Sequence, residues 1–229
     1  MVMTPLDFRS GDPIRTTTMM NTVPSGGGRA HWEKIHADRA PEQVSWYQAR
    51  PEISLAMIRD AATRPDAAIL DVGGGASRLV DGLLDAGYLH VTVLDIAANA
   101  VHRARTRLGE RAGRVRWRIQ DIADGLGGER FDVWHDRAVF HFLVDPAGRD
   151  AYLAALGEAL RQDGAVVLAT FAPDGPDRCS GLPVKRYDPP ALGCTLGPAY
   201  RLLDTRDEIH RTPGGAPQHF VYCRFQRCG

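Results

Sequence analysis

The chain has 229 residues, enough for one α/β domain with a buried core and additional segments. Lys plus Arg is 28 and Asp plus Glu is 28, so the formal net charge is zero. The chain has no excess of positive charge that would indicate nucleic-acid binding. No window approaches the roughly 20 apolar residues of a membrane span, and the N-terminus lacks the apolar stretch of a signal peptide. We therefore expect a cytoplasmic protein that binds neither nucleic acid nor membrane.

The cysteines and one arginine-rich segment have plain structural interpretations. Four cysteines without a close CxxC pair do not make a disulfide framework in a chain of this length, so we expect thiols. The segment 103–118 is rich in arginine. We interpret it as a solvated helix face followed by a strand edge, in preference to a nucleic-acid site.

The N-terminal part differs in composition from the rest of the chain. Residues 1–28 mix Thr, Met, Pro and Gly without periodicity and end in a Gly-rich stretch typical of a flexible linker. We predict a flexible tail over 1–28 and one domain over 29–229. The first part of that domain, about 29–64, is predicted to be a helical cover with helices near 31–38 and 51–62.

From residue 68 onward, short apolar runs alternate with segments of helical spacing. Strands are predicted at 68–72, 90–95, 115–119, 131–135 and 165–171, and helices at 77–86, 98–108 and 150–160. Such alternation indicates a parallel sheet. Two final strands, 200–210 and 218–226, are joined by a turn and must be antiparallel. The predicted fold is α/β: a doubly wound, mostly parallel seven-stranded sheet with a C-terminal antiparallel hairpin strand and helices on both faces.

Three glycines, Gly73, Gly74 and Gly75, follow the first predicted strand directly. The backbone there must turn sharply and let a ligand approach closely, and ligands of parallel sheets bind outside the carboxyl ends of the strands. The position therefore indicates a nucleotide-binding loop. A dinucleotide fingerprint needs a glycine where Arg78 stands, which disfavours a dehydrogenase.

Carboxylates also mark the ends of the next two predicted strands. Asp95 closes the second strand and is placed to accept both ribose hydroxyls of a nucleoside. Asp121 follows the third strand, where it can accept from an adenine amino group while Ile122 packs on the ring. The alternatives are a helix cap for Asp121 and a core position for Ile122, and we favour cofactor contact for Asp121.

The segments 71–77, 93–96 and 121–122, in this order and at this spacing, resemble the successive motifs of class I S-adenosylmethionine-dependent methyltransferases. Asp71, ahead of the glycines, suits the positive amino and sulfonium groups of that cofactor better than it suits phosphates. Further segments look like those of bacterial methyltransferase-domain proteins related to the thiopurine and protein-lysine methyltransferases, at residues 31–34, 44–47 and 135–138.

The resemblance implies S-adenosylmethionine as the cofactor and assigns no metal. The residues that it places around the cofactor are Asp71, Gly73, Gly74, Gly75, Ser77, Asp95, Ile96, Asp121, Ile122 and His135, with Trp46 and Tyr47 in the N-terminal cover. The alternative for the two aromatic residues is an anchor that packs a helix onto the sheet.

The methyl acceptor is expected beside the end of the fourth predicted strand. Methyl transfer from a sulfonium is an in-line displacement, so the protein mainly orients the acceptor, a contribution of ~7–11 kcal/mol. A general base adds about 10²–10⁴-fold where the acceptor must lose a proton. His135, Asp136 and His141 are candidate bases or acceptor ligands, and Arg137 is a candidate substrate contact. The alternatives are an ion pair or helix cap for Asp136 and Arg137, and a core histidine in an apolar helix for His141.

A long Pro- and Gly-rich loop, 172–184, lies at the same edge and is typical of a lid. It contains Cys179, while His210 and Cys223 belong to the two final strands. These three residues are candidate substrate contacts that would converge on a soft metalloid or thiol-reactive substrate. The plainer interpretation is unrelated thiols, one of them a small buried hydrophobe.

These observations favour an enzyme that methylates a small-molecule acceptor at an O, N or S centre, as a monomer or homodimer. A protein-lysine methyltransferase is an alternative and would need an open groove. A regulatory S-adenosylmethionine-binding protein without catalysis is another, and would have its acceptor pocket closed by side chains. An NAD-dependent oxidoreductase is the least favoured, because Arg78 replaces a glycine and no hydride-transfer dyad is visible.

Overall fold

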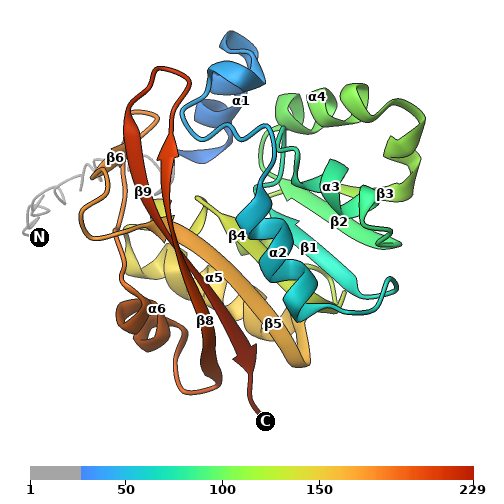
Figure 1. The fold of residues 1–229 in the computed structure, drawn as a ribbon, viewed down its shortest axis with the longest axis vertical. Coiled ribbons are helices and arrows are strands. Elements are labelled where there is room, and N and C mark those ends of the chain that lie inside the picture. The colour runs from blue at the N-terminus through green and yellow to red at the C-terminus, as the bar shows by residue number, and fades with distance from the viewer. Residues whose placement is uncertain (1–26) are drawn as a thin grey trace, which may run out of the picture.

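The computed structural model describes residues 27–229 (Figure 1). Residues 1–26 of the predicted tail lie outside the described residues, and Gly28 already begins the first helix. The helices are α1 Gly28–Asp38, α2 Glu52–Ala61, α3 Leu79–Asp85, α4 Ala98–Leu108, α5 Pro146–Ala159 and α6 Pro189–Leu196. Short 3-10 helices are η1 Pro41–Gln43, η2 Gly109–Arg114, η3 Ile122–Asp124 and η4 Phe140–Phe142.

One seven-stranded sheet forms the centre of the molecule, in the order β3-β2-β1-β4-β5-β9-β8. Its strands are β1 Ala68–Val72, β2 His90–Asp95, β3 Val115–Ile119, β4 Phe131–Arg137, β5 Leu160–Phe171, β8 Tyr200–Arg211 and β9 Pro217–Arg227. The pairs among β1 to β5 are parallel, and β9 is antiparallel to both β5 and β8. The predicted fold class is confirmed. The last strand of the chain, β9, inserts between β5 and β8.

The predicted strands and helices agree closely with the structure, and the differences have local causes. α5 begins at Pro146, earlier than predicted, because the Asp145 carboxylate caps it by accepting from the Gly148 N–H at 2.7 Å. α6 was not predicted, although Asp188 caps it in the same way and two prolines occupy its first turn.

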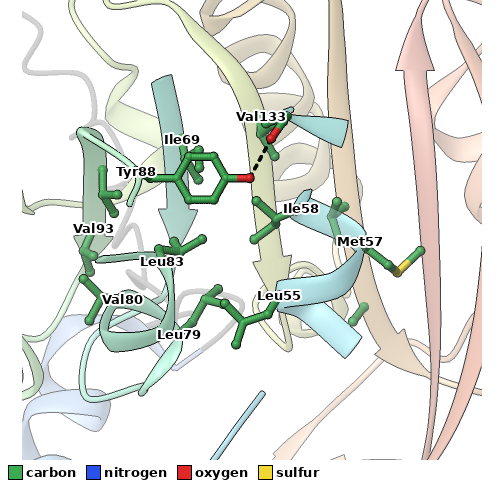
Figure 2. Packing of buried hydrophobic residues seen from close by; sticks show 14 of the residues in the cluster. Leu55, Met57, Ile58, Ile69, Leu79, Val80, Leu83, Tyr88, Val93 and Val133 are labelled. Carbon is green, nitrogen blue, oxygen red and sulfur yellow. Dashed lines mark hydrogen bonds between the residues drawn. The ribbon is translucent and has the colours of Figure 1, made fainter. Parts of the chain in front are cut away.

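Two apolar clusters, one on each face of the sheet, hold the layers together. Figure 2 shows the first cluster, in which α2 and α3 pack against β1 and β4. The labelled residues include Leu55, Met57, Ile58, Ile69, Leu79, Val80, Leu83 and Val133. The second cluster packs α5 and α6 against the other face and includes Trp134, Tyr152 and Phe140. Helices therefore cover both faces of the central strands, while most residues of the edge strand β8 are exposed or half-buried.

The arginine-rich segment makes ion pairs with acids of neighbouring elements. Arg107 lies 2.7 Å from the Asp81 carboxylate, and Arg111 lies 2.6 Å from that of Asp85. Arg118 pairs with Glu129. Within the described residues, no helix combines the length and the apolar character that crossing a membrane requires.

Replacing Ile58 by alanine tests the packing of α2. Ile58 is 0% exposed in the first cluster, so Ile58→Ala should lower the free energy of unfolding by about 2–5 kcal/mol, through lost burial and the cavity left behind. Urea denaturation measures the change. Leu89→Ala, at a side chain that is 57% exposed, is the matched control and should change stability by less than about 0.5 kcal/mol. Equal effects of the two substitutions would contradict this assignment of the core.

Candidate active site

A cleft opens at the carboxyl ends of β1, β2 and β4, where the strand order changes direction between β1 and β4. It consists of two adjoining hollows of about 640 and 960 Å³, open space at their mouths included. The residues that line both are His36, Trp46, Val72, Gly73, Asp95 and Arg137. The strand ends thus bring together side chains that are far apart in the sequence.

The glycine loop after β1 is shaped by two buried carboxylates. Gly73 has a φ of +67°, which favours glycine. A side chain on Gly74 would overlap the Asp71 carboxylate, and one on Gly75 would overlap that of Asp95. The absence of side chains therefore lets the loop lie directly against both acids.

Asp71 belongs to a buried chain of hydrogen bonds. Its Oδ1 accepts from His135 Nδ1 at 2.7 Å, and His135 Nε2 lies 2.9 Å from the Ser54 hydroxyl at the start of α2. Among the described residues, Asp71 Oδ2 has no hydrogen-bond partner. A buried carboxylate oxygen in the wall of the smaller hollow suits a cationic group of a ligand, such as an ammonium.

Asp95 lines both hollows and is 7% exposed. Its Oδ1 accepts from the Ala97 N–H at 2.8 Å. Burial, with smaller contributions from the nearby carboxylates of Asp71 and Glu33, raises the pKa of this carboxyl to about 7. Asp95 therefore changes its charge near neutral pH, at a position where it can accept hydrogen bonds from a ligand.

The far end of the larger hollow is lined by Ile96, Gln120, Asp121 and Ile122. Asp121 caps η3, because its Oδ1 accepts from the Ala123 N–H at 3.0 Å. Asp121 therefore both caps η3 and lines the cleft. Gln120 was not among the predicted site residues.

All but one of the residues predicted to surround the cofactor line this cleft. The exception is Gly75, which packs against Asp95. The others are Trp46, Tyr47, Asp71, Gly73, Gly74, Ser77, Asp95, Ile96, Asp121, Ile122 and His135.

An N-terminal cover holds aromatic side chains over the cleft. Glu33 in α1 fixes the cover, since its carboxylate accepts from the N–H groups of Ala98 and Asn99 at 2.6 and 3.0 Å, at the start of α4. The ring of Trp32 lies edge-on to that of Trp46, with centroids 5.9 Å apart. The cover is therefore anchored to the same end of the sheet as the glycine loop.

His36 lines both hollows and was missed by the sequence analysis. It is 6% exposed, and its Nδ1 has no hydrogen-bond partner among the described residues. Burial, together with the nearby charge of Arg103, lowers its pKa to about 4, so the imidazole is neutral at pH 7. The available signal was its spacing from Trp32, four residues along α1 and hence on the same helix face.

Two candidate bases lie away from the cleft, which corrects the sequence-based assignment. Side chains alternate along β4, so His135 and Arg137 face the cleft while Asp136 faces α5. Asp136 accepts from the Tyr152 hydroxyl at 2.7 Å and from backbone N–H groups of the following turn. His141 is fully buried between aromatic rings, and burial lowers its pKa to about 3. Both are structural.

The structure does not bring Cys179, His210 and Cys223 together. Cys179, in the short hairpin of β6 Arg178–Cys179 and β7 Leu182–Pro183, lines the larger hollow, and burial raises the pKa of its thiol. His210 Nε2 lies 2.8 Å from the Ser45 carbonyl oxygen. Cys223 packs on the opposite face of the sheet, because residues alternate along β9. No group of three or more His, Cys, Asp or Glu side chains in the described part is arranged to hold a metal ion.

Arg137 stands at the end of β4 and lines both hollows. Its Nε donates to the Tyr222 hydroxyl at 2.7 Å, and its Nη1 donates to the Trp46 carbonyl at 3.0 Å. Its Nη2 lies 3.6 Å from the Glu208 carboxylate. The guanidinium is thus fixed between the C-terminal hairpin and the N-terminal cover.

Comparison with known proteins agrees with this geometry. Residues 70–166 match the family model described as a methyltransferase domain. That segment runs from β1 into β5 and includes the glycine loop and Asp95. This part of the chain is therefore similar to a methyltransferase domain.

Particular relatives are more distant. The eEF1A lysine and N-terminal methyltransferase of Danio rerio is 27% identical over 146 residues, which is 62% of this chain. The match spans 21% of that protein, so this chain corresponds to about a fifth of its length.

Solved structures share the fold. One of them is described as the conversion of a disulfide bond into a thioacetal group during echinomycin biosynthesis. Its TM-score is 0.71 at 19% identity, and the match covers 87% of this chain and 93% of that one. The 1,6-didemethyltoxoflavin-N1-methyltransferase of Burkholderia thailandensis has a TM-score of 0.63 at 22% identity, covering 88% and 84%. The N-methyltransferase NodS of Bradyrhizobium japonicum, in complex with S-adenosylhomocysteine, has a TM-score of 0.66 at 17% identity, covering 87% and 97%.

The charge of Asp95 predicts how nucleoside binding depends on pH. Ribose hydroxyls donate to the ionised carboxylate, and the raised pKa of about 7 means that the free protein holds a proton there below pH 7. The affinity for S-adenosylhomocysteine should therefore fall as the pH is lowered from 7 to 5.5 and level off above about 7.5. Calorimetry across this range measures it. Asp95→Asn should bind more weakly at pH 8 and lose most of the pH dependence. An unchanged pH dependence in that variant would remove Asp95 from the ribose site.

The close fit of the glycine loop predicts the effect of one added methyl group. Gly75→Ala places a Cβ against the Asp95 carboxylate and 2.8 Å from the Ala100 Cβ, so the loop must shift. We expect nucleoside affinity to fall by tenfold or more in a calorimetric titration. Gly113→Ala is the matched control, because nothing lies within 4 Å of the added atom, and it should bind normally. Normal binding by Gly75→Ala would contradict the role of this loop.

Proposed function

We propose that this protein transfers the methyl group of S-adenosylmethionine to an O, N or S centre of a small-molecule acceptor. The observation that carries the proposal is the cleft itself, in which a glycine loop and two buried carboxylates adjoin a hollow with aromatic walls. The matched methyltransferase domain contains the loop and one wall of that cleft.

The cleft residues suit this cofactor group by group. The unpartnered Asp71 Oδ2 would hold the cationic amino group, and Asp95 would accept the ribose hydroxyls. Asp121 and Gln120 offer polar atoms for the adenine edge, and Ile122 offers an apolar surface for the ring. A pyrophosphate would instead meet two carboxylates at the loop, which disfavours a dinucleotide.

The protein's part in the reaction is positioning. S-adenosylmethionine supplies an activated methyl group on its sulfonium. The Ser54–His135–Asp71 chain and the glycine loop hold one reactant, while the aromatic cover excludes water and orients the other. The neutral imidazole of His36 lines both hollows, and its unpartnered Nδ1 would accept a hydrogen bond from the attacking group and orient it.

The apolar side chains at one end of the larger hollow favour a small, partly apolar acceptor. Trp32 of α1, Phe142 and Cys179 line this end. The toxoflavin-precursor enzyme that shares this fold is described with its small heterocyclic substrate bound. The match to the zebrafish lysine methyltransferase favours the alternative, a protein-lysine acceptor. In either case we infer one catalytic domain over 29–229, acting as a monomer or homodimer.

Parallel calorimetric titrations with S-adenosylmethionine, S-adenosylhomocysteine and NAD test the cofactor class. We expect micromolar binding of the first two and no binding of NAD, because the loop offers carboxylates where NAD carries phosphates. Binding of NAD alone, or of none of the three, would refute the proposed function.

A screen with radiolabelled methyl donor then separates the acceptors. Methylation of small aromatic and heterocyclic compounds supports the proposal, and methylation restricted to protein substrates supports the lysine alternative. Cofactor binding without transfer to any acceptor class would favour a regulatory role.

A further inference from the structure

Charge is distributed unevenly along the cleft. The nucleoside side carries Asp71, Asp95 and Asp121. Among the residues that line the two hollows, Arg137 is the only lysine or arginine. A guanidinium keeps its positive charge at any physiological pH. The cleft therefore offers acids to one ligand and a single fixed cation beside the aromatic walls.

The position of that cation is determined by the protein. The Nε and Nη1 atoms of Arg137 donate to Tyr222 and to the Trp46 carbonyl, and its guanidinium carbon lies 4.3 Å above the centre of the Phe220 ring. Its side chain is 8% exposed. A guanidinium held on three sides is preorganised for a further partner and is not a mobile surface charge.

One nitrogen of this guanidinium lacks a hydrogen bond. Arg137 Nη2 is buried and has no hydrogen-bond partner among the described residues. It forms an ion pair with Glu208 at 3.6 Å, which is too long for a hydrogen bond, while the Glu208 carboxylate accepts shorter bonds from Gln48 at 2.7 Å and Tyr222 at 2.6 Å. A buried charged donor without an acceptor is costly, so a ligand oxygen in the cleft would satisfy it.

The side chains around Arg137 indicate the shape and polarity of the rest of the ligand. Trp46 lines the cleft beside it, and Trp32 and Phe142 continue the wall with ring centroids 5.0 Å apart. Aromatic walls of this kind favour a flat apolar body, because offset and edge-on ring contacts add to the burial of apolar area. A flat ring system with one anionic oxygen group meets both conditions.

We propose that the methyl acceptor is a planar aromatic molecule that carries a carboxylate, and that Arg137 binds this carboxylate while Trp32, Trp46 and Phe142 enclose the ring. This inference rests on the proposed function and names the substrate class of the same site. The carboxylate is the anchor of the acceptor, and Arg137 is its specificity-determining residue.

The test compares matched carboxylates and amides on protein saturated with S-adenosylhomocysteine. The probes are benzoate, 4-hydroxybenzoate and 2-naphthoate, each paired with its amide, and calorimetry measures their dissociation constants. We expect the best carboxylate to bind at least tenfold more tightly than its amide, since charge-assisted bonds to a guanidinium are lost in the neutral partner. Arg137→Met should abolish this preference, and Arg137→Lys should retain part of it.

Two controls keep the result interpretable. Arg201→Met removes an exposed arginine of β8 that does not line the cleft, and it should preserve the carboxylate preference. The wild-type comparison of carboxylate with amide needs no variant, so it stands even where Arg137→Met fails to fold.

Three outcomes would overturn the inference. The first is equal binding of carboxylates and amides, or no binding of either, by the saturated wild-type protein. The second is a preference that survives Arg137→Met. The third is a variant that binds S-adenosylhomocysteine more weakly but 5′-methylthioadenosine normally, because the anion bound by Arg137 would then be the cofactor's own carboxylate. Failure of the wild-type protein to bind S-adenosylhomocysteine would instead refute the proposed function, and this inference with it.

Discussion

The close approach of a glycine loop to two buried carboxylates is the constraint on which the rest of the site depends. Asp71 and Asp95 end neighbouring parallel strands, and the loop between them lies against both because Gly74 and Gly75 have no side chains. Burial raises the pKa of Asp95, the Asp71 carboxylate adds to the rise, and a cationic ligand group would offset both effects. The loop, the acids and the preference for a positively charged cofactor thus form one physical unit.

The N-terminal cover and the C-terminal hairpin complete the cleft from opposite sides. Glu33 ties α1 to the first turn of α4, while Tyr222 and Glu208 of the hairpin hold the guanidinium of Arg137. The end of the cleft at Arg137 is therefore built from both ends of the described chain around a common sheet.

Much of the candidate site followed from the strand ends. Asp71, Asp95 and Asp121 were predictable because each lies at or just beyond the end of an apolar strand, and the carboxyl ends of parallel strands meet at one edge. His36 and Gln120 were not predicted: the spacing of His36 from Trp32 shows a shared helix face, but only the packing of α1 on the sheet turns that face to the cleft. Asp136 and His141 were assigned to the acceptor site because they are close in sequence to the end of β4. Alternation along β4 instead points Asp136 into the core, and aromatic rings bury His141.

The sequence by itself determined the alternation of strands and helices, the parallel sheet and the place of the nucleoside loop, because these depend on local periodicity and on short glycine and acid patterns. Only the tertiary structure decided that β9 lies between β5 and β8, since pairing order depends on long-range packing and not on chain order. Alternation along β9 places Cys223 on one face of the sheet and Tyr222 on the other. It thereby separates the cysteines and holds Arg137 at the cleft.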